Sequence, residues 1–321
     1  MKYRQAFLAE PYKFIIKEVE AEPKGDELLV KISSCGLCNW ELNFWSGKLN
    51  FLGYPHSLGH EWAGVVAQVG PDVKSFAVGD KVSGFAPDFG GFAEYKAISE
   101  TVCQKLGDTI DPKYAMGEPQ KCVVTVLRAI APEAGDVGVV LGCGPMGLWC
   151  TQALAGQYLE KLIAADIDET KLAMAKTFGA THTINTKSEN VSEVITAITG
   201  GRLADFVIEG TGIPALLNEA QHYLKTTGRG KLAMMSSHSS ATSEFDFRIA
   251  MDKCLQITSA HPSFSHNQAD DFRRAVSLIN NGTFKNKEMV SHEFALDDIQ
   301  AAFEALDNKP ADFIKGIVVC E

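Results

Sequence analysis

The residues with the clearest capacity for chemistry are two cysteines, a histidine and two glutamates in the first 120 positions. The stretch "CGLC" places Cys35 and Cys38 three positions apart, "GHEW" contains His60 and Glu61, and "GEP" contains Glu118. Thiolate, imidazole and carboxylate are the ligand types of catalytic zinc sites, which keep one position open to water or substrate. A closed structural zinc site usually takes two CxxC pairs, and this chain has one.

The CxxC pair has two other interpretations. A redox pair is expected between a strand and a helix of a βαβ unit, whereas this pair lies in β-rich sequence. Two buried, unreactive thiols remain an interpretation, more so for Cys35 than for Cys38. A cytoplasmic protein keeps its thiols reduced, so we expect most of the remaining cysteines to be small buried hydrophobic residues: Cys103, Cys122, Cys143, Cys150, Cys254 and Cys320.

Two kinds of sequence pattern predict the elements that position these residues. Residues 28–98 read as short strands broken by glycines, which predicts an antiparallel sheet, curled or closed into a barrel. From about residue 121, apolar strands alternate with helical segments, which predicts an α/β fold with a parallel sheet covered on both faces. The expected strands are 137–142, 161–167, 204–210, 230–236 and 254–260. Two helices and a last strand follow residue 261, and spacing does not reveal which domain they join.

The stretch "VVLGCGPMGL" predicts a phosphate-binding turn. It places Gly142, Gly144 and Gly147 in a GxGxxG pattern between an apolar strand and a helix, with Pro145 and Met146 inside the turn. The first glycine makes the tight turn, the second lets the backbone approach a pyrophosphate, and the third lets helix and strand pack closely. The helix N-terminus then offers N–H groups to the phosphates.

An acidic residue after the next strand favours NAD over NADP. Asp166 ends that strand, where a carboxylate can accept the ribose hydroxyls of NAD and would repel the 2′-phosphate of NADP. No arginine follows directly, and Lys171 is the nearest cation.

Composition excludes several partners. The chain has 321 residues, 45% hydrophobic and 22% charged, with a net charge of −10. Such a surface repels nucleic acids, and no cluster of lysine and arginine offsets it. The first residues, "MKYRQAFLAEPYKFIIKEVE", lack the apolar region of a signal peptide, and no apolar run is long enough to span a bilayer. We therefore expect a cytoplasmic protein with no nucleic-acid or membrane partner.

Taken together, the motifs resemble the zinc-dependent medium-chain dehydrogenase/reductase family over essentially the whole chain. They are "CGLC", "GHEWAGVVAQVG", "VGDKV", "EP", "VVLGCGPMGL", "IEGTG" and the final "KGIVV". The resemblance implies a GroES-like β-rich catalytic domain formed by residues 1–120 and completed by 261–321. A doubly wound Rossmann domain of residues 121–260, which binds NAD, would be inserted between them. It also implies a homodimer or homotetramer, with Rossmann sheets joined edge to edge near residues 254–260.

The same resemblance assigns roles to individual residues. Cys38 and His60 match catalytic zinc ligands, and Glu61 matches an acidic residue beside zinc that can become a ligand. Glu118 matches a position that is glutamate in the polyol branch of the family. Lys315 matches a basic residue that approaches the cofactor pyrophosphate. Cys35 is then a packing residue.

Two departures from the family pattern affect the prediction. The segment 83–95 has no cysteine, so the lobe that carries a structural zinc is absent and we expect one zinc per chain. The family often has serine or threonine two residues after the zinc cysteine and a histidine three residues further on, as a proton relay. Here these positions are Trp40 and Asn43, so the usual relay cannot operate.

Several neighbouring residues keep two interpretations. Glu41 could orient His60 or be a surface carboxylate. A proton could leave through Glu118 or through His56, although a solvated loop histidine is the simpler interpretation of His56. Trp40 could shape the substrate pocket, where an indole face suits the C–H face of a sugar or cyclitol, whereas we expect Trp45 in the core.

The leading functional hypothesis is a zinc-dependent oxidoreductase that transfers hydride between NAD and a secondary alcohol of a polyol, sugar or cyclitol. A zinc-free NAD(P)H-dependent enone or quinone reductase of the same superfamily is one alternative. A dinucleotide-binding protein without catalytic activity is the other.

Overall fold

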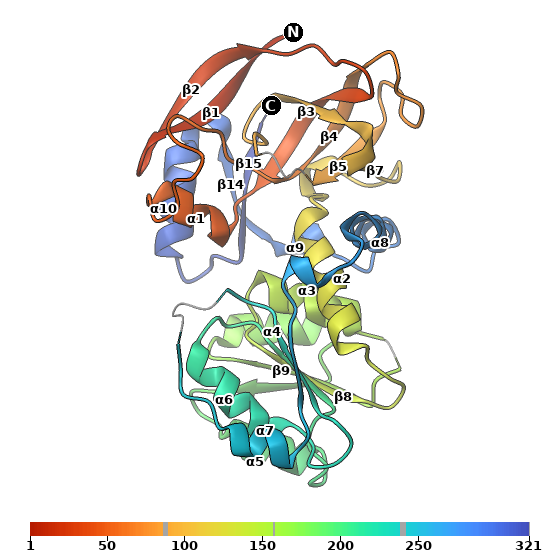
Figure 1. The fold of residues 1–321 in the computed structure, drawn as a ribbon, viewed down its shortest axis with the longest axis vertical. Coiled ribbons are helices and arrows are strands. Elements are labelled where there is room, and N and C mark those ends of the chain that lie inside the picture. Colours follow the sequence, from red (N-terminus) through yellow and green to blue (C-terminus); the bar gives the residue numbers. More distant parts are fainter. Residues whose placement is uncertain (86–88, 157, 238–241, 321) are drawn as a thin grey trace. The chain divides into compact units, whose positions relative to one another are not determined.

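A computed structural model of the protein describes residues 1–85, 89–156, 158–237 and 242–320. The described chain forms two compact units, residues 1–120 with 272–321 and residues 121–271 (Figure 1). The first boundary coincides with the predicted one at residue 120, and the second lies at residue 271 rather than 260. Residues up to 271 stay with the second unit because the buried carboxylate of Asp271 accepts hydrogen bonds from Thr125 and Arg128.

The first unit is built around a seven-stranded sheet. Its strand order is β14-β15-β3-β4-β5-β7, and β6 also pairs with β3. A separate antiparallel pair is formed by β1 and β2. The bounds are β1 Lys2–Glu10, β2 Lys13–Glu20, β3 Glu27–Gly36, α1 Leu42–Trp45, β4 Glu61–Val69, β5 Lys81–Phe85, β6 Tyr95–Ser99, β7 Cys103–Lys105, α9 Asn286–Met289, β14 Val290–Ala295, α10 Ile299–Asn308 and β15 Lys315–Val319.

The two ends of the chain meet in this sheet. Strand β15 pairs antiparallel with β3, with Val318 opposite Cys35, so the last strand completes the N-terminal sheet. Figure 1 shows β14 and β15, at the blue end of the colour scale, beside the red and orange strands of the N-terminal part. One apolar core joins both ends, because Phe303 and Leu306 of α10 belong to the same buried cluster as Phe44 and Trp62. The tail therefore belongs with the N-terminal domain, which spacing alone did not reveal.

The second unit is a six-stranded parallel sheet of order β10-β9-β8-β11-β12-β13. This order is that of the dinucleotide-binding Rossmann fold, whose ligands bind outside the carboxyl ends of the strands. The two central strands, β8 and β11, are buried along their whole length, and β8 is entirely apolar over Val137–Leu141. The bounds are β8 Val137–Leu141, α3 Pro145–Leu154, β9 Lys161–Asp166, α4 Glu169–Thr177, β10 His182–Asn185, α5 Val191–Ile198, β11 Phe206–Glu209, α6 Pro214–Tyr223, β12 Lys231–Met234, α7 Phe247–Asp252 and β13 Gln256–Ser259.

Two helices contain the unit boundaries. Helix α2 (Glu118–Ile130) begins in the first unit, and α8 (Gln268–Asn280) begins in the second. No helix among the described residues is long and apolar enough to cross a membrane.

Candidate metal and dinucleotide sites

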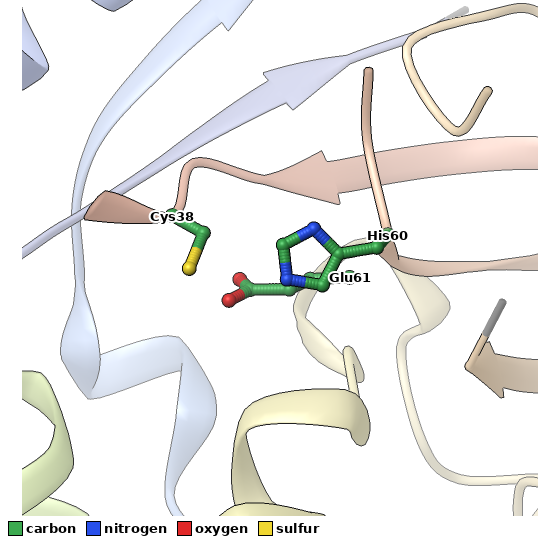
Figure 2. Close-up of side chains that lie close together, drawn as sticks. All are labelled: Cys38, His60 and Glu61. Carbon is green, nitrogen blue, oxygen red and sulfur yellow. The ribbon is translucent and has the colours of Figure 1, made fainter. Parts of the chain in front are cut away.

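The predicted metal ligands of the first unit converge because two antiparallel strands bring them together. Strand β3 ends at Gly36, just before Cys38, and β4 begins at Glu61, just after His60. Cys35 lies directly opposite Trp62 in the β3–β4 pair, so the end of one strand meets the start of the other. Figure 2 shows the Cys38 sulfur, a ring nitrogen of His60 and the Glu61 carboxylate turned toward one another.

The three side chains form a group with the geometry of a metal site. One ligand atom from each of Cys38, His60 and Glu61 lies within 4.8 Å of the other two, and no other group of this kind occurs among the described residues. Sulfur, imidazole nitrogen and carboxylate oxygen are the donors that zinc takes in proteins, so this set fits a zinc ion. Three protein ligands leave a fourth position for water or substrate, as in catalytic sites.

Glu118 lies next to this group without joining it. It is the first residue of α2, and its Oε2 is 3.9 Å from Nε2 of His60. The structure therefore brings together all four predicted ligands, three of them tightly and Glu118 at the edge. Whether Glu118 binds a metal directly stays a prediction.

Glu41 is buried and orients His60. Its side chain has 0% exposure, and its Oε1 accepts hydrogen bonds from Nδ1 of His60 at 2.9 Å and from the backbone N–H of Gly59 at 2.7 Å. The alternative of a surface carboxylate is wrong. A carboxylate on one imidazole nitrogen fixes the ring and leaves the other nitrogen, Nε2, for a metal.

Charges in the group shift each other's pKa. Burial and the Glu61 charge raise the pKa of the Cys38 thiol, although a hydrogen bond to His60 opposes the rise. Burial alone would lower the pKa of His60, but Glu41 and Cys38 outweigh it and hold that pKa well above the usual range. A bound divalent cation must displace both protons, because zinc takes thiolate and neutral imidazole.

Lys315 lies against the metal group, in contact with Glu61. Its side chain is buried, and its ammonium group donates to Oε2 of Glu61 and, at 2.8 Å, to the carbonyl oxygen of Leu37. Burial alone would lower the pKa of Lys315, but Glu61 and Cys38 raise it above its usual value. The family resemblance implies a cofactor contact for this lysine, and nothing in the sequence indicated its pairing with Glu61.

Aromatic rings line one side of His60. Trp40 is 41% exposed, and its indole stacks on Phe89 with ring centroids 5.6 Å apart and planes 12° from parallel. Both rings meet the edge of the His60 imidazole with centroids 6.0 Å away. Phe89 follows residues 86–88 of the cysteine-free segment, which lie outside the described residues, and sequence reasoning missed it.

Other residues near the group have structural roles. Trp45 is buried in the core, as predicted, and Cys35 is buried as a packing residue. The side chain of Asn43 donates a hydrogen bond to the carbonyl oxygen of Trp40. The expectation of a solvated loop for His56 is wrong, because this residue is 8% exposed, with Nδ1 2.5 Å from the carbonyl oxygen of Gly53 and its ring stacked on Tyr54. Of the six remaining cysteines, four are buried, Cys122 is half-buried and Cys254 is exposed.

The glycine-rich turn lies at the carboxyl end of β8. Gly142 has a φ of +90°, and a Cβ on Gly147 would lie 1.8 Å from the carbonyl oxygen of Gly142, so helix and turn pack too closely for a side chain. A Cβ on Gly144, in contrast, would meet no atom within 4 Å. Gly144 is the N-cap of α3, and Pro145 and Met146 are its first residues. The open space at Gly144, at the N-terminus of α3, fits the approach of a pyrophosphate.

Asp166 lies at the end of β9, directly beside this turn. Its Oδ2 accepts a hydrogen bond from the backbone N–H of Cys143 at 2.6 Å, and its Oδ1 accepts one from Asp168 at 3.0 Å. Asp168 caps α4, and the Lys171 ammonium lies 3.8 Å from the Asp168 carboxylate. Asp166 therefore lies beside the glycine-rich turn, and Asp168 and Lys171 follow it at the start of α4.

Comparisons with known proteins agree with this architecture. A family profile described as "Alcohol dehydrogenase GroES-like domain" matches residues 24–108, and one described as "Zinc-binding dehydrogenase" matches residues 145–281. The protein named "Probable D-xylulose reductase A" from Arthroderma otae is 30% identical over 91% of this chain and 90% of its own. The (R,R)-butanediol dehydrogenase of Bacillus subtilis is 27% identical over 91% of both chains.

A solved structure is similar over the whole length. An Escherichia coli oxidoreductase/dehydrogenase of unknown specificity has a TM-score of 0.89 and 27% identity and is covered completely, as is this chain. The chain belongs to the zinc-type medium-chain dehydrogenase family. It is accordingly an oxidoreductase of the alcohol and polyol type, and the GroES-like and Rossmann architecture predicted from the sequence is confirmed.

Proposed function

We propose that this protein is an NAD-dependent, zinc-dependent dehydrogenase that transfers hydride between NAD and a secondary alcohol of a polyol, sugar or cyclitol. The observation that supports it most strongly is the convergence of Cys38, His60 and Glu61, with ligand atoms within 4.8 Å of one another. When bound there, zinc supplies a Lewis acid that polarises a substrate oxygen. Relatives that are named as a D-xylulose reductase and a butanediol dehydrogenase favour small hydroxylated substrates.

The chain's own residues would handle the proton that leaves the alcohol. Trp40 and Asn43 cannot relay it, because one lacks a hydroxyl and the other pairs with a backbone carbonyl. Glu118 is the better candidate, since its carboxylate lies 3.9 Å from Nε2 of His60, at the edge of the metal group. His56 is disfavoured because its ring is buried against Tyr54 and Phe44.

The aromatic side of the site favours a compact substrate. Trp40 and Phe89 present a stacked pair beside His60, and Trp40 keeps 41% of its surface exposed. An indole face can cover the C–H face of a ring, and its N–H can bond a hydroxyl group. A sugar or cyclitol satisfies both requirements.

Asp166 supports NAD as the cofactor. Its carboxylate is fixed by the N–H groups of Cys143 and Asp168, so it cannot readily withdraw from a 2′-phosphate. Asp168 adds a second negative charge, and Lys171 lies beside it at 3.8 Å. A neutral ribose hydroxyl suits this arrangement better than a phosphate does.

A homo-oligomer is proposed through the Rossmann sheet. Strand β13 is an edge strand of that sheet, and its residues are largely exposed. Phe247 and Met251 on the neighbouring α7 are 73% and 74% exposed. A second copy of the chain at this edge would cover unpaired strand groups and apolar side chains together. We also propose that the protein is cytoplasmic and that it has neither a nucleic-acid nor a membrane partner.

Absorbance of NADH at 340 nm tests the proposed activity. The purified protein is incubated with NAD and a panel of polyols, sugars and cyclitols, with and without a zinc chelator. The expected result is substrate-dependent NADH formation that the chelator abolishes and added Zn²⁺ restores. Turnover of enones or quinones with NADPH, unaffected by the chelator, would favour the zinc-free reductase. Nucleotide binding without turnover of any substrate would favour the non-catalytic alternative.

A further inference from the structure

Lys315 and Glu61 form a buried ion pair between segments 254 positions apart in the chain. Glu61 is 3% exposed and Lys315 is 5% exposed, so water screens neither charge effectively. Glu61 is the first residue of β4, and Lys315 is the first residue of β15. Both strands pair with β3, which ends at Gly36, just before Cys38. A buried charge needs a partner, and here each residue supplies the other's.

The backbone between these strands leaves room for the pair. Gly36 ends β3, which lies between β15 and β4 in the sheet. A Cβ on Gly36 would lie 2.3 Å from Oε2 of Glu61 and 3.3 Å from Cε of Lys315. Any side chain at position 36 would therefore displace the ion pair, so the glycine of the CxxC stretch is explained by contact with Glu61 and Lys315.

The ammonium group has two acceptors close to the metal ligands. It binds Oε2 of Glu61, and it binds the carbonyl oxygen of Leu37, the residue before Cys38. With Oε2 engaged, Oε1 is the oxygen that Glu61 would present to a metal. The positive charge also offsets part of the negative charge that a thiolate and two glutamates, Glu41 and Glu61, place in one buried site.

We propose that Lys315 is a positioning residue of the metal centre, which fixes the Glu61 carboxylate as a zinc ligand and balances the charge of the ligand set. Hydrogen-bond partners of metal ligands commonly contribute ten- to a hundredfold to metal affinity. This inference rests on the proposed zinc site and assigns the lysine a role separate from the predicted cofactor contact.

The experiment measures metal binding and nucleotide binding in the same variants. Lys315→Met removes the charge and keeps the length of the side chain, and Lys315→Arg keeps the charge with altered shape. Lys113→Met is the matched control, because Lys113 pairs with Glu293 on the surface of the same unit. Each chelator-treated protein is titrated with Zn²⁺ against a chromophoric chelator, with Co²⁺ as a spectroscopic probe, and with NADH by fluorescence.

The expected result is a loss of zinc affinity of roughly ten- to a hundredfold in Lys315→Met, whether or not NADH affinity also falls, with the control like wild type. Lys315→Arg is expected to fold and to shift the Co²⁺ absorption bands, because the planar guanidinium re-aims the Glu61 carboxylate. This second variant carries the test if Lys315→Met does not fold.

Two results would overturn the proposal, and they differ in what else they overturn. If the folded Lys315 variants bind zinc and cobalt like wild type while NADH affinity falls, the lysine serves the cofactor alone. If the wild-type protein itself binds neither metal, the proposed zinc-dependent function fails together with this inference.

Discussion

Replacing Glu41 with glutamine should weaken zinc binding about tenfold while the fold is retained. Oε1 of Glu41 accepts both hydrogen bonds, from His60 at 2.9 Å and from Gly59 at 2.7 Å. A glutamine oxygen can accept the same two bonds, so Glu41→Gln removes chiefly the negative charge. Hydrogen bonds to charged groups contribute about 1.5–3 kcal/mol and neutral ones about 0.5–1.5 kcal/mol. The midpoints of the two ranges differ by about 1.2 kcal/mol, which for the His60 bond is a factor of nearly ten in affinity.

The size of the loss in zinc affinity depends on pH, because protons compete with zinc for His60. Glu41 helps to raise the pKa of His60 in the metal-free protein, so it also strengthens the binding of the proton that competes with zinc for the imidazole. In Glu41→Gln the pKa of His60 falls and proton competition weakens. We therefore expect the ratio of variant to wild-type Kd to be smaller at pH 6 than at pH 8, where less of the imidazole is protonated.

Competitive titration with a chromophoric chelator at both pH values measures this ratio. Glu18→Gln is the control, because Glu18 is an exposed glutamate that pairs with Lys2 on the surface of the same unit. Circular dichroism and thermal unfolding of the metal-free proteins check that Glu41→Gln folds. A zinc Kd within twofold of wild type at pH 8, in a folded variant, would refute the role assigned to Glu41.

Three further predictions concern the Rossmann unit and the buried thiols. Gly147→Ala should lower the Tm, because its Cβ would lie 1.8 Å from a carbonyl oxygen. Gly144→Ala should keep the Tm of the wild type and weaken NADH binding roughly tenfold or more. Equal Tm values for the two variants would contradict this prediction. Asp166→Ser should lower the kcat/KM ratio of NAD to NADP by about tenfold or more, measured at fixed alcohol, and an unchanged ratio would contradict the role of that carboxylate. Denaturant unfolding should reveal lower stability above about pH 9, by roughly 1 kcal/mol per thiol and pH unit, because the unfolded thiols ionise there and lose protons that the folded ones keep. Constant stability from pH 8 to pH 11 would contradict it; the thiols concerned have a pKa raised to about 12, chiefly by burial, and are Cys103, Cys143, Cys150 and Cys320.

Local patterns made the Rossmann unit largely predictable. The glycine turn, the helix after it and Asp166 at the next strand end are close in sequence, and short-range geometry determines how they meet. The alternation of apolar strands and helices is a property of each segment, so it indicates a parallel sheet without knowledge of distant contacts. The order in which the strands pair within the sheet was not predicted, because it depends on contacts between distant segments.

The metal group was predictable in its ligand types and less so in its surroundings. Cys38 and His60 could be chosen because their neighbours match a family pattern, and the β3–β4 pairing explains how they meet. Glu41 kept two interpretations because burial depends on tertiary packing, which one sequence position does not encode. His56 was misjudged for the same reason.

The long-range contacts carried no sequence signal. Lys315 meets Glu61 from 254 positions away, through a sheet in which the last strand pairs with the third. The space that Gly36 leaves for this pair exists only once both strands are in place. Phe89 lies in a loop and stacks on Trp40, and loops lack the periodic pattern from which such a contact could be predicted.

Zinc content per purified chain is the measurement that tests the central claim most directly. Inductively coupled plasma mass spectrometry of the wild-type protein, prepared without chelator, is compared with that of Cys38→Ser. We expect one zinc per chain in the wild type and loss of that zinc in the variant, because the thiolate is one of three ligands in a group spanning 4.8 Å. A folded wild-type protein without zinc, or a Cys38→Ser variant that keeps it, would contradict the proposed catalytic site.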